Sequence, residues 1–467
     1  MPKRLSRILF AALTAFLIGG TPVSHADPAT SSPSPTIDFP SPAPLVELKD
    51  GDVFVFLGDS ITHQTLYTQY IEDFFLTRYP ERRITFHNAG VNGDRAADAL
   101  RRFDRDVAFY QPDYVSVLLG MNDASYTAWK PEVFEIYVND MTSLLDRLKE
   151  TGAGITLMHP TMFDARAVRM RGQAGEPTAS RYNGALAYYG EWCREMALER
   201  GLGFTDMHAP LNRITFEQRR KDPRFTMIVD GVHPGPDGQV VMAVAMLDET
   251  FVRGRLVSQL TLTSKADRKH ELLAPGVEIS EFSENAEGSI RFTCLAKSLP
   301  WVLPENARLG YTLTRAGHRH SGERFAAQGL KAGEWELAID DVSIGQWSHS
   351  QLARGIELQE NEKTPQYQLS LAVAKANAER NFRHVKKLRD WWGQKKGIEI
   401  ELRKAALNNP GNPAEVAAME QDYQAWIKTK FEPGIAEADA AAQASWEELR
   451  KMAQPKPHRY ELRPAPK

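Results

Sequence analysis

The hydrophobic pattern between Val53 and Phe251 alternates short apolar runs with longer amphipathic segments. Five apolar runs stand out: "DVFVFLG", "RRITFHNAG", "DYVSVLLG", "GITLMHP" and "GFTDMHA". In "PEVFEIYVNDMTSLLDRLKETG" the apolar residues recur at helical spacing and Gly152 follows the last of them, which predicts a helix. Because strands that alternate with helices form a parallel, helix-covered sheet, we expect an α/β domain over residues 47–258.

The pattern changes after residue 258. Residues 259–358 contain alternating segments such as "GSIRFTCLA" and "GEWELAIDD", which predict a small antiparallel β module. Residues 359–455 are mostly helix formers interrupted by "NNPGNP" and "EPG", so we expect a helical hairpin with a third helical arm. Residues 456–467 are a C-terminal tail in which "HRYELRP" alternates again, as a candidate extra strand of the β module.

The first 26 residues have the pattern of a secretory signal peptide. Lys3, Arg4 and Arg7 precede an apolar stretch that is too short to span a membrane, and small residues stand before the expected cleavage point. We therefore expect a secreted or periplasmic protein without a stable membrane span. A Pro/Ser-rich linker over residues 27–46 follows, since such a composition cannot build a packed core.

The net charge and the residue spacings limit which partners, disulfides and cofactors we expect. The formal net charge of -3 becomes -6 without the first 26 residues, so nothing indicates a nucleic-acid partner. Cys193 and Cys294 are far apart in the sequence; export permits a disulfide, but two separately buried thiols are favoured. The histidines and acids show no metal-ligand spacing, so we expect neither a metal nor another cofactor. The oligomeric state stays open.

Three polar clusters that contain glycine directly follow predicted strands: "GDS", "NAGVNGD" and "GMND". The carboxyl ends of parallel strands meet at one edge of the sheet, where ligands bind in such folds. The first cluster contains Ser60, which is either a polar turn residue or a nucleophile. A serine hydroxyl is a weak nucleophile until a base takes its proton, and the base needs an orienting partner, so a nucleophilic Ser60 requires a histidine and a carboxylate.

The loop "VDGVHPGPDGQ" supplies such a pair. Asp230 and His233 lie within one tight turn, so the carboxylate can reach one ring nitrogen while the other faces outward. An acyl-transfer site also needs donors for the developing oxyanion, which the Gly93 N–H and the Asn122 amide would supply. Asp59 is expected to form the turn before Ser60 by accepting hydrogen bonds from nearby backbone, with a role in the site as the alternative. Each cluster alone is an ordinary turn, but together they indicate a site.

In this order the blocks "GDSIT", "NAGVNGD", "GMND" and "DGVHP" resemble those of the SGNH hydrolase family, also called GDSL esterases and lipases. The resemblance covers roughly residues 50–255 and implies a flavodoxin-like parallel sheet with helices on both faces. It implies that Ser60 is the nucleophile, His233 the general base and Asp230 the residue that orients His233. It further implies an oxyanion hole made by the Ser60 N–H, the Gly93 N–H and the Asn122 side chain.

Family resemblance does not name the ester, because the family acts on acetylated polysaccharides, lysophospholipids, thioesters and simple esters. The segment "FDARAVRMRGQAGEPTASRYN" is either a solvated surface loop or a wall of the site. As a wall, its arginines would favour an anionic substrate such as a uronate-containing glycan or a phospholipid head group. These candidate substrate-binding residues are Arg166, Arg169, Arg171 and Arg181.

The sequence predicts a carboxylic-ester hydrolase whose partner is a small ester or an acetylated glycan, with O-acetyl groups on carbohydrate as the first candidate. A lysophospholipase or lipase-type esterase, and a non-catalytic binding protein that retains the fold, remain alternatives. Tryptophans of the second half are expected mainly in cores, with a sugar platform as the alternative for Trp301, Trp335 and Trp347. A packing role against the other domains is likewise expected for the helical region, with contact to a membrane or a partner as the alternative. The residues concerned are Trp391, Trp392, Lys386, Lys387, Lys395 and Lys396.

Overall fold

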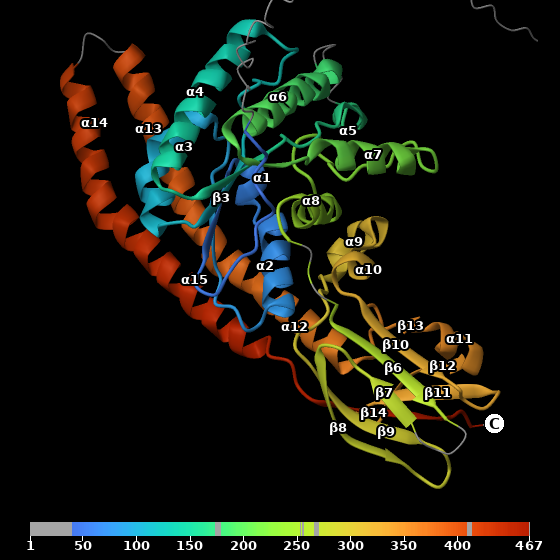
Figure 1. The fold of residues 1–467 in the computed structure, drawn as a ribbon. Helices are drawn as coiled ribbons and strands as arrows, with labels where there is room; N and C mark the ends of the chain where they lie inside the picture. The colour runs from blue at the N-terminus through green and yellow to red at the C-terminus, as the bar shows by residue number, and fades with distance from the viewer. Residues whose placement is uncertain are drawn as a thin grey trace, which may run out of the picture. The chain divides into compact units, whose positions relative to one another are not determined.

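The parallel sheet of the computed structural model has five strands in the order β2-β1-β3-β4-β5 (Figure 1). Their bounds are β1 Val53–Gly58, β2 Thr85–Gly90, β3 Tyr114–Leu118, β4 Gly154–Met158 and β5 Gly203–Thr205. All four pairings are parallel. This order is the flavodoxin-like one, which confirms the predicted fold class.

The structure describes residues 40–172, 179–252, 254, 256–265, 270–408 and 413–466. The expected signal peptide over residues 1–26 and most of the expected linker lie outside the described residues. The described end of the linker, at Val46, makes a parallel bridge with Phe251.

Helices cover both faces of the sheet. Figure 1 shows α3 and α4 on one side of the strands and α2 and α8 on the other. The helices of this domain are α1 Ser60–His63, α2 Leu66–Arg78, α3 Ala96–Asp106, η1 Ala108–Tyr110, α4 Pro131–Glu150, α5 Ala165–Met170, α6 Ala179–Arg200, α7 His208–Arg219 and α8 Pro236–Glu249. Because neighbouring side chains of a strand point to opposite faces, the continuous apolar runs of the sequence are what a doubly covered sheet requires.

The β module contains two sheets, ordered β13-β10-β6-β7 and β12-β11-β14-β9-β8. Its elements are β6 Ser258–Ser264, β7 His270–Leu273, β8 Val277–Glu284, β9 Ile290–Ala296, η2 Glu305–Ala307, α9 Arg308–Thr314, α10 Ala316–His320, β10 Glu323–Gln328, β11 Glu334–Ile339, β12 Val342–Ser348, α11 His349–Arg354, β13 Ile356–Glu357 and β14 His458–Pro464. Most pairings are antiparallel as predicted, but β6 and β10 are parallel. The chain between these two strands passes through the second sheet and then α9 and α10, and only such a long crossover can join parallel neighbours.

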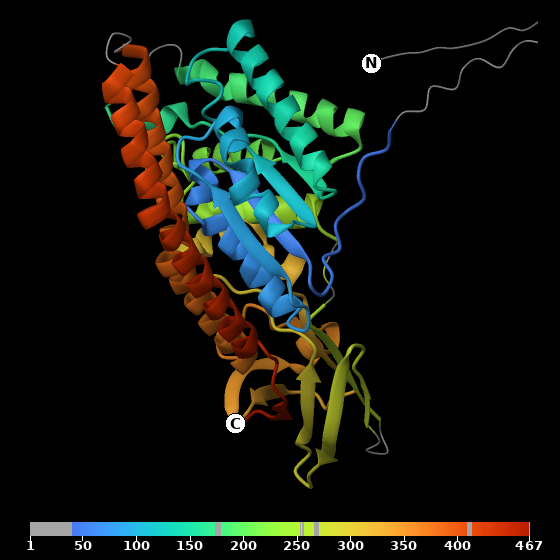
Figure 2. The ribbon, with the colours of Figure 1, turned by 90° about the vertical axis from the view of Figure 1, so that its left-hand side faces the viewer.

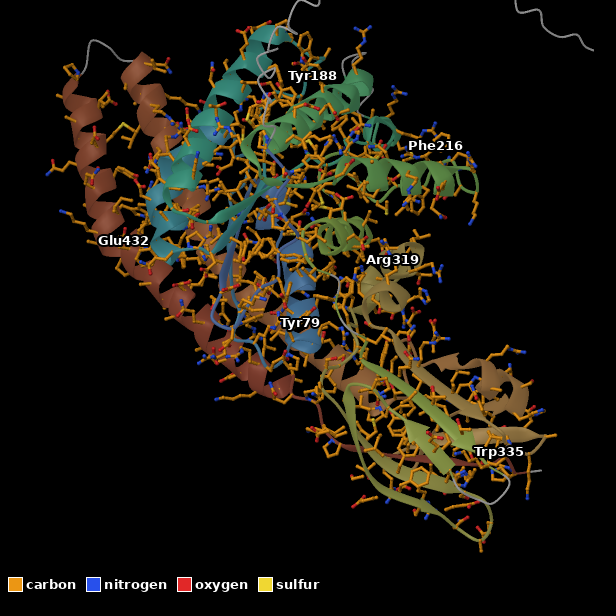
Figure 3. The ribbon with its side chains drawn as sticks, viewed as in Figure 1. Tyr79, Tyr188, Phe216, Arg319, Trp335 and Glu432 are labelled. Atoms are coloured by element: carbon orange, nitrogen blue, oxygen red, sulfur yellow. The ribbon has the colours of Figure 1, made fainter. Side chains whose placement is uncertain are left out.

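Strand β14 comes from the expected tail, 456–467, and lies between β9 and β11. The alternation of "HRYELRP" is therefore that of a strand of the β module, as the sequence indicated. The tryptophans mainly occupy cores: Trp301 is fully buried, and Trp335, labelled in Figure 3, is buried in the hydrophobic cluster of the β module. Trp347 is partly buried against the same core.

Two long helical runs form the C-terminal hairpin (Figure 2). The first is α12 Pro365–Arg380, η3 Asn381–Val385 and α13 Lys386–Asn408; the second is α14 Pro413–Trp426, η4 Ile427–Phe431 and α15 Glu432–Met452. The predicted third arm is wrong, because "EPG" lies inside the second run. Pro433 lacks an N–H and would clash with a regular preceding turn, and the wider π-helical turn η4 directly before it accommodates the proline.

Two further findings concern the predicted absence of a membrane span and the pairing of the two cysteines. Within the described ranges, no helix has the length and apolar character needed to cross a membrane. Cys193 and Cys294 are both buried and free, which confirms the favoured prediction of two separate thiols.

Candidate active site

Ser60 stands at the carboxyl end of β1, as the first residue of the short helix α1. Two glycines let this helix lie against the strand ends: a Cβ on Gly58 would be 2.1 Å from Thr62 Oγ1, and one on Gly90 would be 2.3 Å from the His63 nitrogen. Asp59 accepts a hydrogen bond from the Ile61 N–H at 2.9 Å. Asp59 therefore caps α1 as the sequence predicted, and the cap holds Ser60 at the edge of the sheet.

Ser60, His233 and Asp230 form a continuous hydrogen-bonded chain. His233 Nε2 is 2.8 Å from Ser60 Oγ, and His233 Nδ1 is 2.6 Å from Asp230 Oδ2. The other carboxylate oxygen of Asp230 accepts from the N–H groups of Val232 and His233 at 2.9 and 2.8 Å. Partial burial alone would raise the pKa of Asp230, but these hydrogen bonds outweigh it and lower the pKa. Asp230 is therefore held ionised beside the imidazole.

The loop that carries Asp230 and His233 is fixed by close packing on α5. Asp164 donates its N–H to the Gly231 carbonyl at 2.8 Å. Gly231 has a φ of +88°, and a Cβ there would be 2.3 Å from Val168 Cγ2, so only glycine fits. The helix that begins the arginine segment thus lies directly against the loop of the candidate base.

Gly93 and Asn122 lie at the ends of the next two strands. Gly93 has a φ of +68°, a conformation that favours glycine, and among the described residues its N–H has no hydrogen-bond partner. The Asn122 amide donates to the Asp94 carbonyl at 3.0 Å and is 3.4 Å from Asp59 Oδ2. The long second contact leaves one amide hydrogen available to a stronger acceptor.

Three residues around these donors carried no role in the sequence prediction. Tyr126 donates its hydroxyl to Asn122 Oδ1 at 3.0 Å. Asp123 joins the block "GMND" to the start of α3, because its carboxylate accepts from the Ala96 N–H at 2.9 Å and the Gly120 N–H at 3.0 Å. Asp94 lies next to Gly93 and is almost completely buried. Asp94 and Asp123 were inside the quoted blocks, whereas Tyr126 had no motif that marked it.

Two carboxyl groups beside the site have unusual acidity. Burial, followed by the nearby carboxylates of Asp123 and Asp94, raises the pKa of Asp59 to about 7, against a lowering effect of the Ile61 N–H. Burial also raises the pKa of Asp123 to about 7, although three backbone N–H groups oppose the shift. The site therefore contains carboxyl groups that retain protons well above the usual range.

The four candidate arginines are all exposed. Arg166 donates to the Pro223 carbonyl at 3.0 Å. Within the described part of the chain, no hydrogen bond joins any of these arginines to the serine, histidine and aspartate. Residues 173–178, in the middle of the predicted loop, lie outside the described residues. Among the described residues there is also no group of three or more His, Cys, Asp or Glu side chains arranged to hold a metal ion.

A parallel α/β fold that brings serine, histidine and aspartate together at its strand ends has the arrangement that a serine hydrolase requires. Residues 56–241 match the GDSL-like Lipase/Acylhydrolase family, and this range contains all four sequence blocks. As the resemblance to the SGNH hydrolases predicted, the chain is similar to this family over these residues, and it is a hydrolase of ester bonds.

Several known proteins are similar to this chain. An acetylxylan esterase of Geobacillus stearothermophilus is 26% identical over 234 residues, which cover 45% of this chain and 100% of that protein. A solved structure of Axe2, an acetylxylan esterase from the same organism, is 25% identical with a TM-score of 0.36 and covers 44% of this chain and 98% of that one. BT4096, a gut microbial diltiazem-metabolizing enzyme, is 26% identical with a TM-score of 0.74 and covers 91% of this chain and 100% of that one. The last similarity extends beyond the catalytic domain into the C-terminal half.

Proposed function

We propose that this protein is a secreted serine esterase whose preferred substrates are O-acetyl groups on carbohydrate. The observation that carries the catalytic part is the hydrogen-bonded chain from Asp230 through His233 to Ser60, at 2.6 and 2.8 Å. The non-catalytic alternative would leave this arrangement without a use. Secretion rests on the signal-peptide pattern of the first 26 residues.

The geometry supports a two-step acyl transfer. Ser60 Oγ attacks the ester carbonyl while His233 Nε2 takes its proton, and Asp230 stabilises the imidazolium through Nδ1. The proton on His233 then passes to the departing alcohol, which leaves an acyl group on Ser60. Water, deprotonated by the same imidazole, releases the acid and restores the free serine.

The oxyanion of each tetrahedral intermediate needs donors that are already in place. We assign this role to the Ser60 N–H, the Gly93 N–H and the Asn122 amide. The Gly93 N–H has no competing partner among the described residues, and Tyr126 fixes the Asn122 amide by donating to its oxygen at 3.0 Å. Such donors lower the barrier because they need no rearrangement when the charge develops.

Acetyl carbohydrate is the substrate class with the most support. The curated relative at 26% identity is an acetylxylan esterase. The packing of α5 against Gly231 brings the start of the arginine segment next to the catalytic loop. We propose that the arginines of this segment favour an anionic glycan; they are Arg166, Arg169, Arg171 and Arg181. The similarity to a diltiazem-metabolizing enzyme makes a small-molecule ester the second candidate.

A substrate panel tests this proposal. Purified protein is assayed on p-nitrophenyl esters from acetate to dodecanoate, on acetylated neutral and uronate-containing oligosaccharides, and on lysophosphatidylcholine. We expect the highest kcat/KM on acetate esters and on the acetylated uronate glycan. A maximum at eight carbons or longer, or faster hydrolysis of lysophosphatidylcholine, would instead establish a lipid substrate. N-terminal sequencing of the exported protein tests cleavage after residue 26.

A further inference from the structure

The C-terminal hairpin reaches the loop that carries Gly93. Lys396, on α13, donates from Nζ to the Asn92 carbonyl at 3.1 Å and to Asp94 Oδ1 at 2.8 Å. The same Nζ is 3.3 Å from Asp98 Oδ2, and it would be 3.7 Å from a Cβ on Gly93. One cation from the far end of the chain thus holds the residues on both sides of Gly93.

A row of buried charges continues from this contact into the catalytic domain. Asp94 Oδ2 accepts from Arg102 at 2.7 Å, and Arg102 also binds Asp106 at 2.6 Å. Asp106 is in turn held by two 2.8 Å hydrogen bonds from Arg389 of α13. Arg389 and Lys396 are seven positions apart, so they lie on the same face of the helix. The hairpin therefore anchors both ends of one ionic row.

The row also touches the strand that leads to the nucleophile. Arg102 donates to the Gly58 carbonyl at 3.2 Å, two residues before Ser60. An apolar contact supports the same arrangement, because Val91, at the start of the glycine loop, is buried in one cluster with Leu388 and Trp392 of the hairpin. Farther along, Arg105 pairs with Glu432, which Figure 3 labels on the second helical run, at 3.2 Å.

We propose that Lys396 is a positioning residue of the active site. Through this lysine the hairpin fixes the orientation of the groups that donate hydrogen bonds to the oxyanion. Lys396 fixes Asn92 and Asp94, and thereby the direction of the Gly93 N–H between them. The carbonyl of Asp94 accepts from the Asn122 amide at 3.0 Å, so the same cation also orients the second donor. The hairpin is then a part of the catalytic apparatus as well as a packing element. This inference rests on the proposed function, because it assigns Lys396 to the oxyanion hole of that esterase.

A purely structural role for Lys396 makes a different prediction. If the lysine only joined the hairpin to the domain, its removal would lower the melting temperature and leave the kinetic constants of the folded protein unchanged. A substrate-binding role would raise KM. A positioning role lowers kcat at constant KM, because oxyanion donors act on a charge that exists only in the transition state.

The test compares Lys396→Met with Lys387→Met, both assayed on p-nitrophenyl acetate. Methionine keeps the length of the side chain without its charge or donors. Lys387 is the matched control, because it makes one exposed ion pair from the same helix, with Glu437 at 2.9 Å. We expect Lys396→Met to lower kcat by about 10-fold to 100-fold with KM within about 2-fold, since a small misplacement of reacting groups has effects of this size. Lys387→Met should keep the wild-type constants.

Two further measurements make every outcome decisive. Thermal unfolding shows whether the variants are folded. Lys396→Arg restores a charged donor and should recover part of the kcat that Lys396→Met loses. If Lys396→Met does not fold, Lys396→Arg is tested in its place. A wild-type kcat in folded Lys396→Met, or a loss confined to KM, overturns the inference. If wild type and Ser60→Ala are equally inactive on all esters, the proposed function fails instead, and the two failures are thereby distinguished.

Discussion

The two sides of the candidate site are held in different ways. On the base side, Asp230 and His233 are three positions apart in one loop, and their side chains are 40% and 33% exposed. On the oxyanion side, Asp94 and Arg102 are only 1% and 6% exposed. Asp94 takes its second cation from Lys396, 302 positions away. The base side is local and open to solvent, whereas the charged groups that support the oxyanion side are buried and come from distant parts of the chain.

This difference has an energetic consequence. A buried charge that loses its partner costs about 3 to 5 kcal/mol, so the groups around Asp94 cannot separate easily. An exposed pair such as His233 and Asp230 carries no such penalty and can adjust while the proton moves. We therefore infer that the buried ion pairs around Asp94 are the most rigid part of the site, whereas the side chains of His233 and Asp230 can adjust on their packed loop.

The largest expected effect comes from the base side. Ser60→Ala removes the group that His233 Nε2 contacts at 2.8 Å, and we expect kcat on p-nitrophenyl acetate to fall by about 10⁶-fold. Circular dichroism of the variant should match the wild type, because Ser60 Oγ makes no other side-chain hydrogen bond among the described residues. A variant that keeps most of the activity would show that the site is assigned wrongly.

On the oxyanion side, Asn122→Ala should lower kcat by about 10² to 10³-fold with little change in KM. The amide acts on the transition-state charge, so ground-state binding should be nearly unaffected. Steady-state kinetics with a small acetate ester measure both constants. An increase in KM at constant kcat would make Asn122 a substrate-binding residue and contradict the contrast between the two sides.

Tyr126→Phe should have a smaller effect. The variant loses only the hydrogen bond to Asn122 Oδ1, worth about 1 kcal/mol, so kcat should fall by roughly 5-fold. Tyr188→Phe is the control. Tyr188 (Figure 3) makes edge contacts through its ring, with its centroid 5.2 Å from that of Trp129 and 4.9 Å from that of Phe134, and phenylalanine keeps this ring. Equal constants for the two variants would remove Tyr126 from the oxyanion side.

The smallest expected effect is on stability. Because burial raises the pKa of Asp59 to about 7, the folded state keeps a proton that the unfolded chain loses near pH 4. Stability therefore falls as pH rises from about 4 to about 7, and Asp59→Asn removes this contribution. The measurement is the difference between the melting temperatures at pH 4 and pH 8. In Asp59→Asn this difference should be smaller than in wild type by about 2 °C or more.

Asp104→Asn is the matched control for that measurement, because the Asp104 side chain is 81% exposed. This exposed variant should retain the wild-type difference between the two pH values. If Asp59→Asn retains it as well, burial does not raise the pKa of Asp59 in the folded protein.

The sequence predicts the local features of the base side better than the long-range contacts of the oxyanion side. The strands, the helix up to Glu150 and the loop of Asp230 and His233 depend on neighbouring residues, so periodicity and spacing predict them. The contact between Lys396 and Asp94 joins residues that share no local pattern, and a lysine in a charged helix is ordinarily a solvated residue. Nothing in the sequence distinguishes Lys396 from Lys387.

The helical region shows another limit of local rules. A proline within "EPG" predicts a break, yet the helix continues because the π-helical turn Ile427–Phe431 absorbs the missing donor. The parallel pairing of β6 with β10 was missed for a similar reason, since the alternation of a strand does not specify the direction of its neighbour. Packing over long sequence distances decides both features.

The central claim is that Ser60 is the nucleophile of an ester hydrolase, and covalent labelling tests it most directly. Wild-type protein and Ser60→Ala are each treated with a fluorophosphonate, digested and analysed by peptide mass spectrometry, with Asn122→Ala as a folded variant that keeps the serine. We predict one adduct on Ser60 in the wild type, the same adduct formed more slowly in Asn122→Ala, and none in Ser60→Ala. Labelling of Ser60→Ala at the wild-type rate, or an adduct at another residue in the wild type, would contradict the account.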